Sequence, residues 1–305
     1  TTQDYLEYNE SNQFDLIVAN PPYAKLLPNG KRASKNHNLI KPFLEKSLKL
    51  LKPNGYLLFL TPDNCMSYAD RNKLIQRITS LQIMYLNIHT AKKYFKKVGS
   101  SFIWYLIKNT PGKRKFTVEG IRKGVNYKSK VKSEMRKYIP LVYNDIIQSI
   151  LHKTIDSNLP KFKVETSSDL HKYTKKHLIT IEQDEEHPYR LIHTPKQTVY
   201  SSRPHKYQEG YKVFISITSY YSVGVDNCGM TQNIAFIRCD DFVKAHNIRD
   251  VLKHPLYKFL NDICRWGNFN NIRILQSFPI CDDSELVWHK FNINEKEKEY
   301  ILSFI

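Results

Sequence analysis

Glycine is scarce in this chain, and no two of its ten glycines are separated by a single residue. The chain therefore lacks the Gly-x-Gly turn through which nucleotide-binding α/β folds bring their backbone close to a cofactor. Its five cysteines include no Cys-x-x-Cys pair and are odd in number. This pattern argues against a disulfide framework and a zinc ribbon, and it favours a reducing, cytoplasmic compartment.

Signals for metals and membranes are missing as well. There is no His-Glu-x-x-His motif, and we expect no metal site. No apolar run reaches the length of a membrane helix, and the N-terminus does not read as a signal peptide. We therefore expect no membrane partner.

Positive charge is what the chain has in excess. Its 305 residues, enough for two domains, carry a net charge of +18. An excess of this size suits a polyanionic partner, and double-stranded DNA is the first candidate. An ordinary basic surface, or a codon bias towards lysine, is the alternative.

The most informative residues are Asn20, Pro21, Pro22 and Tyr23, which follow the apolar run 14–19. The run predicts a buried parallel strand, and an open α/β sheet places its chemistry at the carboxyl end of such a strand. An amino or amide nitrogen is a poor nucleophile because its lone pair is delocalised. The side-chain oxygen of Asn20 and the carbonyl of Pro21 could localise that lone pair by accepting both N–H bonds. The prolines stiffen the loop, and Tyr23 offers a flat face to a base. A simple turn closing the strand is the alternative.

Residues 15–23 as a whole, Asp-Leu-Ile-Val-Ala-Asn-Pro-Pro-Tyr, resemble the gamma-class N6-adenine DNA methyltransferases, the TaqI-like and restriction-modification methylases. The Lys-Pro-Asn-Gly-Tyr sequence at 52–56 fits the same family. The resemblance implies S-adenosylmethionine as the methyl donor and a flipped adenine as the substrate. It makes Asn20, Pro21, Pro22 and Tyr23 the catalytic motif.

The first third of the chain alternates strand and helix patterns, which predicts a doubly wound α/β sheet. The resemblance makes this sheet the C-terminal part of a Rossmann-like methyltransferase domain. Strands are expected over 14–19, 56–60, 82–88 and 101–107, and helices over 39–52 and 69–80.

Residues 109–137 change character, being rich in turn residues and in lysine and arginine. We therefore expect the catalytic part over 1–112, a basic linker over 113–140, and a mixed α+β domain for DNA target recognition over 141–305. In the last domain, strands are expected over 212–218 and 233–238, and a closing amphipathic helix over 294–305.

The cofactor residues follow from the resemblance alone. The stretch 1–6 looks like the end of the family's third strand, so Asp4 and Tyr5 match the pair that holds the cofactor's adenine, with Asn20 nearby. Because the glycine-rich turn is missing, we expect a fragment, a split half or a degenerate copy. A second polypeptide or an upstream segment would then carry that turn.

Base stacking and DNA contact complete the expected site. The resemblance assigns the second stacking face to Phe95, with Phe102 as the next candidate beside Tyr23. Basic residues follow both Tyr23 and Phe95 in the sequence and could contact DNA phosphates. They are Lys25, Lys31, Arg32, Lys35, Lys96 and Lys97.

The leading functional interpretation is site-specific adenine-N6 methylation of DNA within a restriction-modification system. Two alternatives stay open. The same motif occurs in RNA and protein-glutamine methyltransferases, because an amide nitrogen poses the same electronic problem. The missing glycine-rich turn also fits a non-catalytic DNA-recognition or scaffold module.

Overall fold

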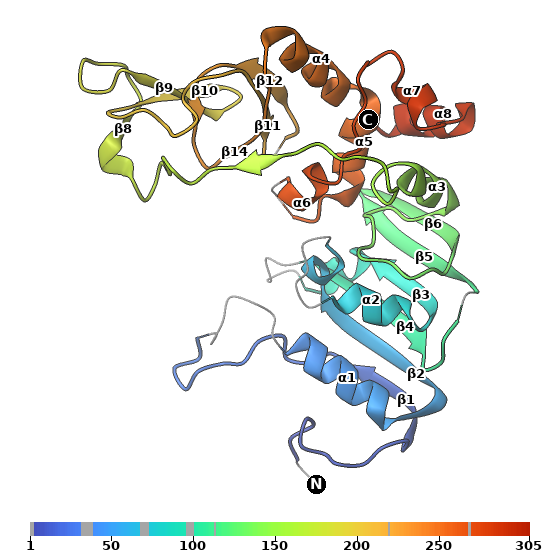
Figure 1. The fold of residues 1–305 in the computed structure, drawn as a ribbon. Helices are drawn as coiled ribbons and strands as arrows, with labels where there is room; N and C mark the ends of the chain where they lie inside the picture. Colours follow the sequence, from blue (N-terminus) through green and yellow to red (C-terminus); the bar gives the residue numbers. More distant parts are fainter. Residues whose placement is uncertain are drawn as a thin grey trace. The chain divides into compact units, whose positions relative to one another are not determined.

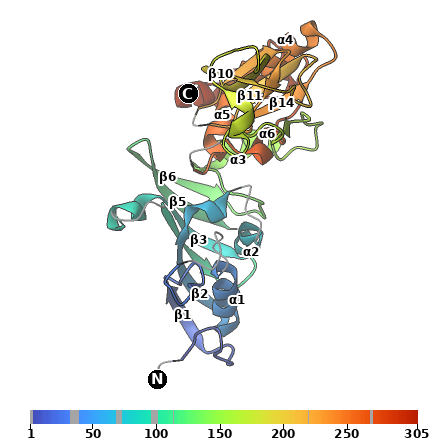
Figure 2. The same ribbon diagram turned by 90° about the vertical axis from the view of Figure 1, so that its left-hand side faces the viewer.

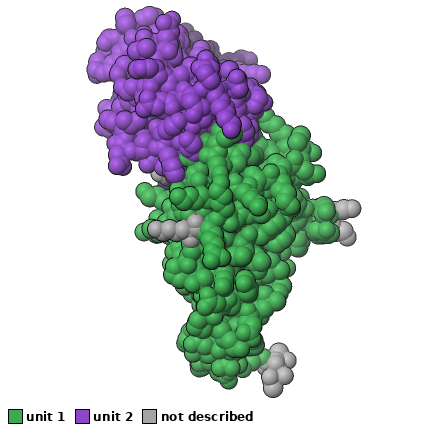
Figure 3. All heavy atoms as spheres, turned by 90° about the vertical axis from the view of Figure 1, so that its right-hand side faces the viewer, with its two compact units in different colours: residues 1–148 green, residues 149–305 purple. Residues whose placement is uncertain are grey.

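The computed structural model describes residues 3–31, 39–67, 73–95, 101–112, 114–218, 220–267 and 270–305. The chain divides into two units, residues 1–148 and 149–305 (Figure 3). Helix α3 (Asp145–Lys153) crosses the division. Within these described ranges, no helix is both long enough and apolar enough to cross a membrane.

Unit 1 is built on one six-stranded mixed sheet with the order β1-β2-β4-β3-β5-β6 (Figure 1). Strands β1 and β2 are parallel, and β4 is inserted antiparallel between β2 and β3. The elements before α3 are β1 (Phe14–Ala19), α1 (Ile40–Leu50), β2 (Leu51–Pro62), η1 (Asp63–Met66), α2 (Leu74–Thr79), β3 (Gln82–Ile88), η2 (Thr90–Tyr94), β4 (Phe102–Lys108), β5 (Lys115–Arg122) and β6 (Val125–Lys132).

The four strands expected from the sequence lie in this one sheet, so the α/β prediction is confirmed. The two expected helices form as α1 and the shorter α2, and residues 68–72 before α2 lie outside the described residues. Helix α1 stops at Leu50, just before Pro53-Asn54-Gly55. Asn54 takes a left-handed φ of 66°, and the register between β1 and β2 shifts there. The predicted turn is thus a bulge at the start of β2.

One face of the unit 1 sheet forms the core. Helices α1 and α2 lie on this face (Figure 2), where Leu57, Phe59, Tyr105 and Ile107 are fully buried. These residues alternate along β2 and β4, as a sheet covered on one side requires.

The prediction of a buried strand over 14–19 is wrong in one respect. β1 is parallel, but Leu16 is 56% exposed and Val18 is 67% exposed. Among the described residues β1 pairs with β2 alone, so it is an edge strand, and its side chains opposite α1 face solvent. The apolar side chains of β1 are therefore more exposed in this chain than is usual for a parallel strand of such composition.

The prediction of a basic linker over 113–140 is also wrong. Residues 115–132 form the β5–β6 hairpin of the sheet. Phe116, Val118 and Val131 are buried, whereas Lys128 and Lys130 alternate with inward residues and face outward. The run of basic side chains is the solvent face of a half-buried strand, and lysines on such a strand protect a sheet edge.

Unit 2 contains two four-stranded sheets, β13-β9-β10-β8 and β12-β11-β14-β7, together with helices (Figure 1). The expected strands at 212–218 and 233–238 form as β11 and β14, and the closing helix forms as α8. The elements after α3 are β7 (Glu165–Thr166), η3 (Lys176–Leu178), β8 (Ile179–Thr180), β9 (Tyr189–Thr194), β10 (Gln197–Ser201), β11 (Lys212–Ser216), β12 (Val223–Asp226), β13 (Gly229–Met230), β14 (Ile234–Arg238), α4 (Phe242–Lys253), α5 (Pro255–Cys264), α6 (Ile272–Leu275), α7 (Val287–Lys290) and α8 (Glu295–Phe304).

Candidate active site

The site expected from the sequence lies at one edge of the unit 1 sheet. The carboxyl ends of β1, β2 and β3 meet the amino end of β4 there, because Pro62 pairs with Phe102 and Ile88 pairs with Ile103. This topology brings the loop after β1, the turn after β3 and the start of β4 to the same edge. The backbone N–H of Leu39 donates to the carbonyl of Tyr23 and ties the loop to the start of α1.

Asn20 and Tyr23 form a hydrogen-bonded pair in this loop. The Tyr23 hydroxyl donates to Oδ1 of the exposed Asn20 at 2.6 Å. Burial raises the pKa of Tyr23 to about 12, so its hydroxyl keeps its proton at neutral pH and acts as a donor. An amide oxygen has two lone pairs, and the bond to Tyr23 leaves one of them for a further N–H donor.

The three aromatic residues singled out in the sequence lie together. The ring of Phe102 is 6.1 Å from that of Tyr23 and 4.4 Å from that of Phe95, centroid to centroid. Phe102 is only 4% exposed, whereas Tyr23 and Phe95 are half-buried. Phe102 therefore packs against the other two rings from the protein interior, and Tyr23 and Phe95 remain partly accessible to solvent.

Sequence reasoning missed a polar pair at the same edge. Nε2 of His89 lies 3.0 Å from Oδ2 of Asp63, and both side chains are mostly buried. Each is the first residue after a strand, Asp63 after β2 and His89 after β3. That position, at the carboxyl end of neighbouring strands, was the signal that could have found them.

Asp4 and Tyr5 are placed differently from the sequence expectation. No described residue before β1 belongs to a strand, and residues 5–7 form a turn. Tyr5 stacks on Phe43 of α1 at 5.5 Å between ring centroids, and its hydroxyl is 2.8 Å from that of Ser47. Asp4 accepts from the backbone N–H of Leu6. The contacts of Tyr5 with Phe43 and Ser47 hold this stretch against α1 rather than in the sheet.

Only two of the basic residues expected to contact DNA lie within the described ranges. Lys25 and Lys31 are described, and both are exposed in the loop after Tyr23. Arg32, Lys35, Lys96 and Lys97 lie outside the described residues.

A serine, histidine and aspartate group in unit 2 is not a hydrolytic triad. Nε2 of His205 is 2.8 Å from the Ser167 hydroxyl, but Nδ1 accepts from the backbone N–H of Tyr207. The neutral ring therefore carries its proton on Nε2 and donates to Ser167, so it cannot take the serine proton. Asp169 lies 4.0 Å from that same nitrogen rather than behind the other one. Burial also lowers the pKa of His205 to about 4.

Residues 1–95 match the family model described as Eco57I restriction-modification methylase. A search of curated proteins gave no match. The Type IIL restriction-modification enzyme MmeI in complex with DNA is similar to the chain with a TM-score of 0.50 and 10% identity, over 84% of this chain and 45% of that one. A DrdV–DNA complex gives a TM-score of 0.51 and 9% identity, over 94% of this chain and 43% of that one.

The chain spans less than half of the length of either structure. At these identities the likeness concerns the fold, and the methyltransferase-like α/β architecture is confirmed. The resemblance to restriction-modification methylases, which the Asn-Pro-Pro-Tyr sequence suggested, is confirmed over residues 1–95.

Proposed function

We propose that this chain supplies the adenine-binding part of an S-adenosylmethionine-dependent DNA adenine-N6 methyltransferase of a restriction-modification system. The observation that carries the proposal is the hydrogen-bonded pair of Asn20 and Tyr23 at the carboxyl end of β1, beside Phe95 and Phe102. The match of residues 1–95 to a restriction-modification methylase family supports it.

Asn20 and Pro21 would act on the electrons of the amino group. Oδ1 of Asn20 and the carbonyl of Pro21 would each accept one N–H of the adenine N6 amino group, which localises its lone pair for attack. The bond from Tyr23 fixes which end of the Asn20 amide carries the acceptor. Acceptors held in place before the reaction stabilise the charge that develops on the nitrogen without reorganising.

Tyr23 and Phe95 would hold the base. Extruding a base from a duplex costs a few kcal/mol of stacking and pairing, and contact with two aromatic faces offsets part of it. Phe102 is buried between them and would set their positions rather than touch the base.

The described residues do not make a complete site for S-adenosylmethionine. One face of Tyr5 is occupied by Phe43, its hydroxyl is bound to Ser47, and the chain has no Gly-x-Gly turn. We therefore propose that a second polypeptide or an upstream segment supplies the glycine-rich contacts. Asp4, Tyr5 and Asn20 would contribute only the adjoining edge of the cofactor site.

The outer face of the unit 1 sheet fits such a partner. Leu16 and Val18 on β1 and Tyr56 on β2 are exposed, and Leu58 and Leu60 on the same face of β2 are half-buried. An edge strand with a contiguous apolar face is a surface that proteins normally cover. A partner segment that packs against this face would bury it, and a strand added at the free edge of β1 would satisfy the backbone groups of that edge.

DNA binding would involve both units. Lys25 and Lys31 lie exposed in the loop just after Tyr23, and unit 2 would recognise the target sequence. Because this interaction depends on phosphate contacts, the affinity for duplex DNA should fall steeply with salt. Binding that is absent at low salt, or insensitive to salt, would favour codon bias as the source of the charge.

Two assays test the proposal against its alternatives. The isolated chain should bind S-adenosylmethionine weakly, and a micromolar dissociation constant would show that its cofactor site is complete. The enzyme reconstituted with the missing contacts should place methyl groups on N6 of adenine in DNA, as base-modification mapping would show. Methylation of RNA or of a glutamine amide would overturn the substrate assignment, and no methylation at all would favour a recognition module.

A further inference from the structure

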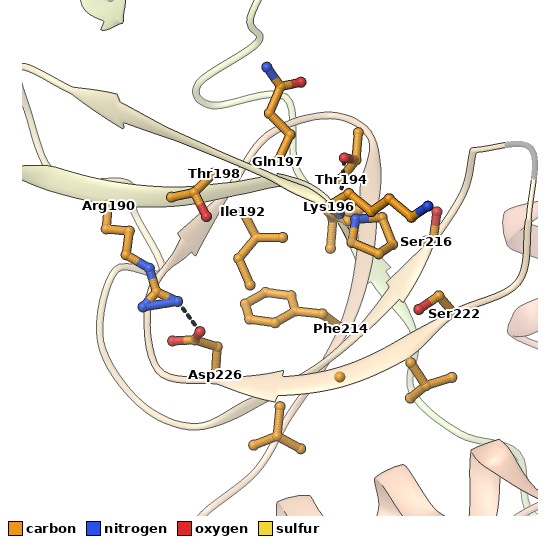
Figure 4. A pocket seen from close by; sticks show the side chains of 15 residues that line it. Arg190, Ile192, Thr194, Lys196, Gln197, Thr198, Phe214, Ser216, Ser222 and Asp226 are labelled. Carbon is orange, nitrogen blue, oxygen red and sulfur yellow. Dashed lines mark hydrogen bonds and ion pairs between the residues drawn. The ribbon is translucent and has the colours of Figure 1, made fainter. Parts of the chain in front are cut away.

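Unit 2 contains a cavity of about 410 Å³ between the β9–β10 hairpin and the β11–β12 hairpin (Figure 4). A volume of this size is within the range of small-ligand sites in proteins. Protein interiors are otherwise packed nearly as densely as organic crystals. Its lining includes Arg190, Ile192, Lys196, Phe214, Gly224 and Asp226.

The middle of the cavity is apolar and left open by a glycine. Ile192 and Phe214 lie at its centre in Figure 4. Gly224 pairs directly with Phe214 across β11 and β12. A Cβ added at Gly224 would meet no atom within 4 Å, so the cavity is open at this strand position, while the buried Phe214 forms its apolar floor. A flat, apolar group fits there.

The two ends of the cavity are polar in different ways. Arg190 and Asp226 form an ion pair at one end, which presents donors and an acceptor side by side (Figure 4). Lys196 extends towards Ser216 and Ser222 at the other end. In the described part of the chain Lys196 has no carboxylate partner, and its ammonium group lies 5.9 Å from the ring centre of the exposed Tyr220. That end suits an anion.

We propose that this cavity binds a nucleotide. Lys196 holds the phosphate, the base lies in the apolar middle beside Phe214, and the Arg190–Asp226 pair meets the hydrogen-bonding edge of the base. The same chemistry is offered by a free mononucleotide and by one nucleotide of a DNA strand. The site lies entirely in unit 2 and is separate from Asn20 and Tyr23, so it does not depend on methyl transfer.

Calorimetric titration of the full chain tests the site with four probes: deoxyadenosine monophosphate, deoxyadenosine, inorganic phosphate and a short single-stranded oligonucleotide. The monophosphate should bind more tightly than either the nucleoside or phosphate alone. An oligonucleotide that competes with the monophosphate identifies a strand as a source of the ligand. If the oligonucleotide binds and the monophosphate does not, and Gly224→Val abolishes the oligonucleotide binding, the ligand is a nucleotide of a DNA strand only.

Two variants separate the cavity from general charge. Gly224→Val places a Cβ where no atom lies within 4 Å, and its two methyl groups extend into the open space. It should weaken binding about tenfold or more at an unchanged melting temperature. Lys196→Met should weaken the phosphate-bearing probes by about tenfold, because a charge-assisted contact is lost, and should leave deoxyadenosine unaffected. Lys258→Met, on the exposed side of α5, is the matched control and should change nothing.

The proposal fails if neither the monophosphate nor the oligonucleotide binds, or if Gly224→Val leaves all affinities unchanged. It also fails if Lys258→Met weakens binding as much as Lys196→Met, because the attraction would then come from net charge. Should Gly224→Val prove unstable, Lys196→Met against Lys258→Met decides alone, since both lysines are exposed.

Discussion

The Tyr23 hydroxyl donates a 2.6 Å hydrogen bond to Oδ1 of Asn20. The residue proposed to stack on the base thus also orients the amide proposed to accept from its amino group. The two roles of Asn-Pro-Pro-Tyr are therefore coupled. This coupling gives substitutions at Tyr23 two separable consequences.

Tyr23→Phe keeps the ring and removes the hydrogen bond to Asn20. A net loss of about 1 kcal/mol lowers the methylation rate about fivefold. Tyr23→Ala also removes a stacking face, which is worth about 1–3 kcal/mol. Single-turnover rates and the fluorescence of 2-aminopurine at the target position measure these effects. A Tyr23→Phe enzyme with the unchanged rate would show that the bond to Asn20 has no part in catalysis.

Val18→Asp tests whether the outer face of β1 is covered in the complete enzyme. Val18 is 67% exposed, so the isolated chain should lose little stability, about 1 kcal/mol at most. Burial of the new carboxylate should destabilise the complete enzyme by about 2 kcal/mol or more.

Val125→Asp is the matched control for this experiment, because Val125 is 68% exposed on the β5–β6 hairpin. It should behave alike in the isolated chain and in the complete enzyme. Thermal unfolding of both proteins gives the comparison. Equal effects of the two substitutions in the complete enzyme would mean that the face of β1 remains open to solvent.

Asp169 makes the stability of unit 2 depend on acid pH. The hydrogen bonds from Arg203, and then the one from the backbone N–H of Lys206, hold the pKa of Asp169 at about 2, below its ordinary 3.8. A lowered folded-state pKa contributes stability that is complete above the unfolded value and is lost as the pH falls from about 4 to 2.

Asp169→Asn should therefore destabilise unit 2 by about 2 kcal/mol at pH 7 and flatten the loss of stability between pH 4 and 2. Denaturant unfolding followed across that pH window is the measurement. A variant that retains the full acid dependence would assign it to other carboxyl groups.

The sequence predicts four strands of the unit 1 sheet because its apolar runs at 14–19, 56–60, 82–88 and 101–107 alternate with helical patterns and are bounded by turns. The order of the strands in the sheet depends on pairing between distant segments, which no local pattern gives. The clustering of Tyr23, Phe95 and Phe102 came from the resemblance, and the structure brings the three rings together. The sequence places Phe102 inside the expected strand 101–107 and Phe95 before it, which favours a core position for Phe102, and its 4% exposure agrees with this.

Two errors have physical causes. The composition of residues 115–132 predicts a linker because outward lysines dominate it, and they mask the period-two pattern of inward residues such as Val118 and Val131. The apolar residues of β1 predict a strand that is buried on both faces. The local sequence does not show which other elements pack against a strand. The pair of Asp63 and His89 depends on the meeting of two strand ends that are distant in the sequence.

The most direct test of the central claim is the single-turnover methylation rate of the complete enzyme with Asn20→Ala, measured with saturating duplex DNA. Asn20 is proposed to act on the amino group as charge develops, so its loss should appear in the chemical step while DNA affinity is retained. The expected loss is about 3 kcal/mol, or roughly a hundredfold in rate. An unchanged rate would mean that Asn-Pro-Pro-Tyr is only a turn at the end of β1, and the proposed function would be wrong.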